Sequence, residues 1–253
     1  MKDEKLPIHK GVYILPNMIT TLSLFSGIMG VIYAMDGRFE LAAFAIIFSG
    51  LMDGLDGKVA RLTHTASEFG VQYDSLADCV AFGVSPALIM WLWHVHTFGR
   101  LGCAAVFIYA ACGALRLARF NISTASTSKR FFVGLPIPGA ACTAISLILI
   151  ESYLPQFLQP AMPYFTLFMT VALGILMVSR VRYFSFKEYD FVRAHPFSTM
   201  VTAMLIFALI VTAPKLFAFL LCFGYIIGGL VYTFMILPRR NRELLRNLSL
   251  TSE

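Results

Sequence analysis

Apolar residues fill this chain in long, nearly continuous stretches that short polar segments separate. A membrane-spanning helix needs about 20 apolar residues, because the hydrocarbon core is about 30 Å thick and each residue rises about 1.5 Å. Stretches near that length occupy residues 14–34, 40–61, 70–95, 101–121, 135–153, 162–180, 198–213 and 216–237. The pattern predicts an all-α, polytopic membrane bundle of about eight transmembrane helices. The seventh stretch is short and ends at Pro214, so six or seven spans remain open.

Composition and charge support a membrane location. Of the 253 residues, 58% are hydrophobic and 13% are charged, with a mean hydropathy of +0.75, which excludes an ordinary soluble domain. If the N-terminus is cytoplasmic, only Arg38, Arg100 and Lys215 of the 20 basic residues fall outside. Cytoplasmic loops collect Lys and Arg. We therefore expect a protein of the cell (inner) membrane with both termini in the cytoplasm.

Four aspartates interrupt the second and third apolar stretches. Asp53 and Asp56 are three residues apart, and Asp74 and Asp78 are four apart, so each pair shares one face of a helix. Two like charges about 4 Å apart repel by about 4 kcal/mol at an effective dielectric constant near 20, so four close carboxylates need protons or a shared cation. A set of oxygen ligands alone suits Mg²⁺, Mn²⁺ or Ca²⁺. We predict a site for two divalent ions, Mg²⁺ or Mn²⁺, held by all four aspartates.

The residues between the two aspartate pairs predict a helical hairpin. Thr65 and Glu68 have the spacing of a capping box, so we expect one helix to end near Arg61 and the next to begin near Ala66. In an antiparallel hairpin, both aspartate pairs lie at the same depth, because about eight residues separate each outer acid from the turn. The active site would then open at the cytoplasmic face.

Small residues flank the predicted acidic faces. Gly57, Ala60 and Gly70 each lie one helical turn from an aspartate and leave room for a bulky ligand. Arg61 stands at the hairpin mouth, where its guanidinium can meet an anion such as a pyrophosphate. Acids in apolar helices can also form structural ion pairs or a cation path, so a divalent-cation transporter is the rival hypothesis. Against transport, the other acid near a helix body, Glu151, is assigned to the outer end.

The spacing of these residues resembles a known family. The pattern D-x2-D-G-x2-A-R-x8-G-x3-D-x3-D, filled here from Asp53 to Asp78, is similar to the signature of the integral-membrane CDP-alcohol phosphotransferases. Segments 13–17, 70–78, 116–121, 134–138 and 182–187 further resemble the branch of CDP-diacylglycerol–serine O-phosphatidyltransferases. The resemblance covers about residues 12–190. It implies transfer of a phosphatidyl group from CDP-diacylglycerol to L-serine, with CMP as the second product.

The resemblance also implies roles for individual residues. Asp78 would serve as general base for the serine hydroxyl, besides being a metal ligand. The start of the first helix, with Asn17 and Thr20, would lie beside the nucleotide. The full set of expected CDP-diacylglycerol contacts is Asn17, Thr20, Gly57, Ala60, Arg61 and Gly70.

A basic segment after the fourth apolar stretch is the candidate for binding the acceptor. Arg116 and Arg119 share a helix face and precede Asn121 and Lys129, so we predict that these four hold the serine carboxylate. Positive charge at this position is also what a cytoplasmic flank requires. The signature fixes the donor and leaves the acceptor open. Glycerol 3-phosphate, inositol phosphate or another alcohol, and an archaeal lipid donor, therefore remain alternatives.

The chain is expected to form one integral-membrane domain over residues 1–253, because no internal repeat divides it. The catalytic core would cover about 12–190, and residues 198–253 would add accessory helices and a basic cytoplasmic tail. We expect contact with membrane lipid, a homodimer and no nucleic-acid partner.

Overall fold

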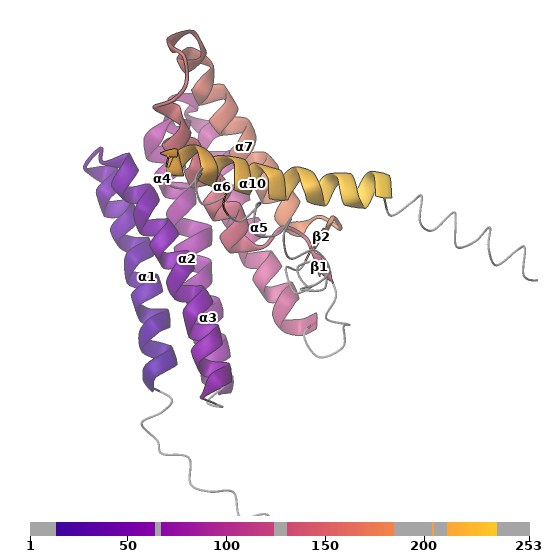
Figure 1. Ribbon diagram of the computed structural model, residues 1–253. Helices are drawn as coiled ribbons and strands as arrows, with labels where there is room; N and C mark the ends of the chain where they lie inside the picture. Colours follow the sequence, from indigo (N-terminus) through magenta and orange to yellow (C-terminus); the bar gives the residue numbers. More distant parts are fainter. Residues whose placement is uncertain (1–13, 64–66, 124–130, 185–203, 205–211, 237–253) are drawn as a thin grey trace, which may run out of the picture.

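A bundle of helices makes up the fold (Figure 1). The computed structural model describes residues 14–63, 67–123, 131–184, 204 and 212–236. The predicted all-α membrane bundle is confirmed, with the addition of one short β-ribbon.

The first two helices form an antiparallel hairpin, α1 (Ile14–Met35) and α2 (Phe39–Leu62). The turn between them uses Gly37 at φ 75°, a left-handed conformation that glycine adopts without strain. Across the pair, the hydroxyl of Ser23 donates to the backbone oxygen of Ser49 at 3.0 Å, and that of Ser49 donates to the backbone oxygen of Ser23 at 2.8 Å. Small polar residues of this kind let membrane helices approach closely. They hold the middle of α1 against the middle of α2.

The third helix, α3 (Glu68–Asp78), returns alongside α1. Ser67 caps it, because the backbone N–H of Gly70 donates to the Ser67 hydroxyl at 3.0 Å. The predicted start near Ala66 is therefore about two residues early, and Thr65 lies outside the described residues. Glu68 occupies the first turn, where its charge favours the helix N-terminus, rather than completing a capping box.

The path of α3 continues through a π-helical segment, η1 (Cys79–Val84), into α4 (Ser85–Trp93). The backbone N–H of Ser85 donates to the oxygen of Val80, five residues back. Pro86 has no N–H, and its ring would clash with the carbonyl four residues before it in a regular α-helix. The chain accommodates this proline with a wide π-helical turn immediately before it.

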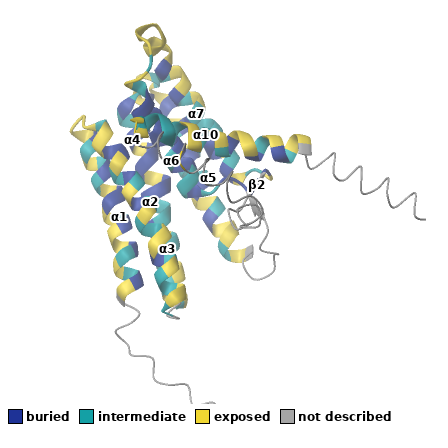
Figure 2. Cartoon of the chain, viewed as in Figure 1, coloured by how far each residue is buried: buried dark blue, intermediate teal, exposed yellow. Residues whose placement is uncertain are grey.

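The core of the bundle surrounds α6 (Ile137–Glu151), in which every residue from Ala140 to Ile150 except Cys142 is buried. Figure 2 shows buried residues in the middle of the bundle and exposed ones along its outer helices. The remaining elements that pack around or connect these helices are α5 (Arg100–Ser123), α7 (Met162–Val178), η2 (Val95–Phe98) and η3 (Gln156–Ala161).

Two short strands, β1 (Phe131–Val133) and β2 (Arg182–Phe184), pair in antiparallel register and were not predicted. Gly134 follows β1 with φ 86°, and its N–H donates to the oxygen of Val181 at 2.8 Å. A Cβ at Gly134 would lie 2.4 Å from the oxygen of Met177, so only glycine fits here. The ribbon therefore ties the entrance of α6 to the end of α7.

The last described helix is α10 (Pro214–Val231), which the π-helical η4 (Tyr232–Ile236) extends. It crosses in front of the other helices in Figure 1. Lys215 at its start pairs with Glu40 at the start of α2, and its later part packs against β2 and α6. The helix thus runs from the α1–α2 turn toward the β-ribbon.

The predicted count of eight spans is not confirmed. Five helical stretches in the described part of the chain are long and apolar enough to cross a membrane: Leu15–Met35, Glu68–Trp93, Arg100–Ile122, Gln156–Val178 and Pro214–Met235. By those criteria α2 falls short because it carries the charged hairpin residues, and α6 has only 15 residues. The predicted stretch 198–213 lies almost wholly outside the described residues.

Glu151, Trp93 and His94 form a hydrogen-bonded cluster at the end of the bundle opposite the aspartate hairpin. The carboxylate of Glu151 accepts from the indole N–H of Trp93 at 3.2 Å and lies 3.1 Å from Nε2 of His94. Asp36 and Glu40 lie at the same end, around the α1–α2 turn. Among the described residues, no acid lies between this end and the hairpin.

Candidate functional site

The hairpin brings the predicted aspartates together. Asp53 and Asp56 lie on the last three turns of α2, and α3 carries Asp74 opposite them. One carboxylate oxygen from each of these three lies within 4.8 Å of the others. The carboxyl group of Asp78, one turn further along α3, lies within hydrogen-bonding distance of Asp53. All four acids therefore form one connected group.

The surroundings of these acids favour a cation. Asp56 is only 4% exposed, and Oδ1 of Asp74 is buried without a hydrogen-bond partner. Buried polar atoms in proteins are almost always paired, so an orphan carboxylate oxygen beside two further carboxylates indicates a missing positive group. The donor set contains oxygen alone, which suits a hard divalent ion. The cluster can bind a metal.

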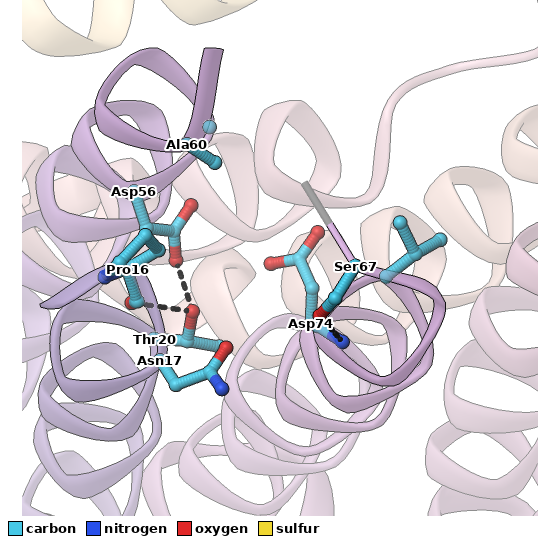
Figure 3. A pocket seen from close by; sticks show the side chains of 10 residues that line it. Pro16, Asn17, Thr20, Asp56, Ala60, Ser67 and Asp74 are labelled. Carbon is cyan, nitrogen blue, oxygen red and sulfur yellow. Dashed lines mark hydrogen bonds between the residues drawn. The ribbon is translucent and has the colours of Figure 1, made fainter. Parts of the chain in front are cut away.

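Thr20 of α1 fixes the orientation of the most buried acid. Its hydroxyl lies 2.7 Å from Oδ2 of Asp56, to which it donates, and 3.1 Å from the backbone oxygen of Pro16 (Figure 3). Charged acceptors make stronger hydrogen bonds than neutral ones. Asp56 is thereby held with one oxygen on Thr20 and the other available to a ligand.

A pocket of about 140 Å³ opens beside the acids, between α1, α2 and α3. Figure 3 shows Asp56, Thr20 and Asn17 on one side of it and Asp74 and Ser67 on the other. The glycines and the alanine on its walls leave the backbone accessible, as the sequence predicted. Its lining residues are Pro16, Asn17, Thr20, Asp56, Gly57, Ala60, Ser67, Gly70, Val71 and Asp74.

Five of the six predicted nucleotide contacts line this pocket, and Arg61 does not. Arg61 is exposed on α2, one helical turn after Gly57. A Cβ added to Gly57 would lie 4.0 Å from Nη2 of Arg61. Its guanidinium therefore lies beside a lining residue, at the edge of the pocket.

The structure divides the predicted acceptor group. Arg116 is half-buried on α5 and lies near both Asp78 and Tyr225 of α10. The side-chain amide of Asn121 donates to the Ser75 hydroxyl at 3.0 Å, next to Asp74 on α3. Arg119 is exposed, and Lys129 lies outside the described residues. Arg116 and Asn121 therefore join the site, while Arg119 is exposed.

Sequence reasoning missed several residues around the site. Ser67 and Val71 line the pocket, and the hydroxyls of Thr21 and Tyr73 lie 2.8 Å apart between α1 and α3. Tyr225 was missed because α10 was interpreted as an accessory helix. For Ser67, the available signal was a Ser immediately before an acidic first turn.

Comparison with known proteins gives consistent matches. The family model for CDP-alcohol phosphatidyltransferase matches residues 13–175, which include all four aspartates. A CDP-diacylglycerol--serine O-phosphatidyltransferase of Helicobacter pylori is 43% identical over 72% of this chain and 76% of its own length. One of Methanocaldococcus jannaschii is 33% identical over 84% and 90%, and an archaetidylserine synthase of Methanothermobacter thermautotrophicus is 34% identical over 67% and 69%.

Proposed function

This chain belongs to the CDP-alcohol phosphatidyltransferase family, and from that premise we propose that it transfers the phosphatidyl group of CDP-diacylglycerol to the hydroxyl of L-serine. The products are phosphatidylserine and CMP. The observation that carries this function is the pocket between α1, α2 and α3, which opens directly onto Asp56 and Asp74. The names of the bacterial and archaeal relatives support serine as the acceptor.

The aspartates are assigned to the metal. Oxygens of Asp53, Asp56 and Asp74 lie close enough together to share one divalent ion, and Asp78, which interacts with Asp53, adds a fourth carboxylate for a second ion. We assign these to Mg²⁺ or Mn²⁺. When bound, such ions neutralise the pyrophosphate and stabilise the charge that develops on the leaving CMP.

The pocket residues are assigned to the nucleotide. The side chains of Asn17 and Thr20 offer polar contacts on one wall, and the absence of larger side chains elsewhere lets a phosphate approach the helix backbones. Arg61 would close over the outer phosphate. The CDP-diacylglycerol contacts are therefore Asn17, Thr20, Gly57, Ala60, Gly70 and, at the mouth, Arg61.

Asp78 is assigned as the general base. The serine oxygen attacks the phosphorus that carries the diacylglycerol, the bond from that phosphorus to the CMP oxygen breaks, and the serine proton passes to Asp78. Asp78 is suited to this because it lies deepest on α3, beside Arg116. A hydroxyl is a poor nucleophile near pH 7 without such an acceptor.

The acceptor carboxylate is assigned to the basic segment at the end of α5. Arg116 lies beside Asp78, and Asn121 is anchored to α3 through Ser75. Arg119 and Lys129 complete the set as cations that can attract serine from the cytoplasm. This places serine on the α5 side of the acids and the nucleotide on the α1 side.

The setting in the cell is also part of the proposal. We place the hairpin and both termini on the cytoplasmic side of the inner membrane. Exposed apolar side chains along α1, including Met18, Phe25 and Met35, suit contact with lipid or with a second copy in a homodimer.

The function is tested with purified protein, CDP-diacylglycerol and Mn²⁺ or Mg²⁺, by measuring CMP release with a panel of acceptors. We expect rapid release with L-serine, little with glycerol 3-phosphate or inositol phosphate, and phosphatidylserine as the lipid product. An archaeal CDP-lipid belongs in the panel because one relative is named as an archaetidylserine synthase. Faster release with another alcohol would reassign the acceptor.

The contact between Thr20 and Asp56 gives a second test. Replacing Thr20 by Val removes the hydroxyl that orients Asp56. Partners of metal ligands are worth about 10–100-fold in metal affinity or activity, so the Mn²⁺ concentration that gives half-maximal turnover should rise by about that factor. Thr20→Ser keeps the hydroxyl and serves as the matched control. An unchanged Mn²⁺ requirement in Thr20→Val would show that this hydrogen bond does not position a ligand.

A further inference from the structure

Two tyrosines from outside the family-matched region continue outward from Arg116: Tyr225 lies near Arg116, and Tyr183 stacks on Tyr225. Arg116 interacts with Tyr225 of α10 as well as with Asp78. The ring of Tyr225 stacks on Tyr183 of β2, with centroids 5.2 Å apart and planes 29° apart. These two tyrosines lie beyond residue 175, where the match to the family model ends.

Two polar atoms in this cluster are buried without hydrogen-bond partners. One is Nε of Arg116, and the other is the hydroxyl of Tyr183, a residue that is 0% exposed. Leaving a buried donor unpaired costs about 1–3 kcal/mol. Each of these two donors therefore lacks an acceptor, and Tyr225 lies next to both residues that carry them.

The fold holds Tyr183 in place at close range. A Cβ added to Gly229 of α10 would lie 2.3 Å from Cε1 of Tyr183, so a glycine there is required for the ring to fit. Gly228, next to it, has nothing within 4 Å of an added Cβ. Burial raises the pKa of Tyr183 to about 12, with a smaller contribution from Tyr225, so the phenol keeps its proton near pH 7 and can donate it.

We propose that Tyr183 and Tyr225, together with Arg116, form the subsite for the carboxylate of the acceptor amino acid. Arginine supplies the charge and a planar set of donors, the Tyr183 hydroxyl adds a neutral donor, and Tyr225 holds both side chains in position. This deepens the proposed function and rests on it. Because α10 and β2 follow the family-matched region, they add acceptor selectivity to a donor site that the family shares.

The proposed subsite separates recognition of the acceptor from recognition of the CDP-lipid donor. The donor pocket uses α1, α2 and α3, whereas the carboxylate subsite uses α5, β2 and α10. An acceptor without a carboxylate would leave Arg116 and Tyr183 unpaired, and sites with buried polar groups reject such analogues strongly.

The test compares Tyr183→Phe and Tyr225→Phe with Tyr164→Phe, a matched control at an exposed tyrosine on α7. We measure the KM for L-serine, the KM for CDP-diacylglycerol and the competitive inhibition constant of L-alanine, which keeps the carboxylate and lacks the reacting hydroxyl. In Tyr183→Phe the serine KM and the alanine inhibition constant should both rise by about 10-fold or more, as expected for a hydrogen bond to a charged group. Tyr225→Phe should raise both constants by a smaller factor. The KM for CDP-diacylglycerol should stay unchanged.

A second pair of variants tests the same subsite without touching a polar atom. Gly229→Ala should displace Tyr183 and raise the serine KM, while Gly228→Ala should leave it unchanged. If the serine and alanine constants in Tyr183→Phe, Tyr225→Phe and Gly229→Ala equal those of their controls, the subsite is wrong. If the unmodified protein makes no phosphatidylserine, the proposed function itself fails, so the two failures are distinguishable.

Discussion

Replacing Asp56 by Asn is expected to abolish CMP release, with a loss of at least about 10³-fold. A bound divalent ion contributes several kcal/mol to a transition state, and each 1.36 kcal/mol is a factor of ten in rate. Asp56 is the most buried acid of the group and is oriented by Thr20. The Asn side chain cannot supply the negative charge, and its burial keeps it in the position of the metal ligand. The same loss is expected for Asp53→Asn and Asp74→Asn.

Thermal unfolding separates loss of the metal from loss of the fold. Without metal, each Asn variant should melt at the same temperature as the unmodified protein or higher, because a like-charge repulsion has been removed. Added Mn²⁺ should raise the melting temperature of the unmodified protein and not that of the variants. Asp36→Asn, at the exposed α1–α2 turn, is the matched control. Full turnover by protein treated with EDTA would overturn the metal assignment.

Replacing Asp78 by Asn is expected to reduce turnover by about 10²–10⁴-fold, the usual contribution of a general base. Binding of CDP-diacylglycerol should stay within about tenfold, or about 1.4 kcal/mol. The reason is geometric, since Asp78 touches Asp53 and lies toward Arg116, whereas the nucleotide pocket is lined by Asp56 and Asp74.

Titration calorimetry with CDP-diacylglycerol, run beside the CMP-release assay, measures the two effects of Asp78→Asn separately. Glu151→Gln, which changes a carboxylate at the opposite end of the bundle, is the control for a general effect of charge. Equal losses of nucleotide binding and turnover would make Asp78 chiefly a metal ligand and leave the proton acceptor unassigned.

The aspartate hairpin could be predicted from the sequence because its information is local. The i, i+3 and i, i+4 spacings determine which side chains share a face, and the interval between the pairs requires a turn. The same spacing argument put Gly57, Ala60 and Gly70 beside the acids, whereas Asn17 and Thr20 came from the family resemblance; all five line one pocket. Even here the predicted helix start was early, because the Thr65–Glu68 spacing was taken as the cap, whereas Ser67 caps the helix.

The contacts of the acceptor side could not be predicted, because they join segments that are distant in the sequence. Tyr225 lies about a hundred residues from Arg116, in an apolar helix whose sequence carries no chemical signal. The ribbon that positions Tyr183 has only three residues in each strand, too short for an alternating pattern to reveal. Tertiary packing alone brings these groups together.

The π-helical segment η1 acts as a phase shift between the acids and the core. A π-helical turn holds about one residue more than an α-helical turn. Because each residue of an α-helix turns by about 100°, the helix after η1 is rotated by about that angle relative to an uninterrupted α-helix. Asp74 and Asp78 can therefore face α2 while Ile89 and Met90, further along the same path, are fully buried in the core. A one-residue deletion within Cys79–Val84 would restore a uniform helix and swing one of these two faces out of alignment. Deleting one residue within η1 should therefore reduce activity and stability more than replacing any one of its residues.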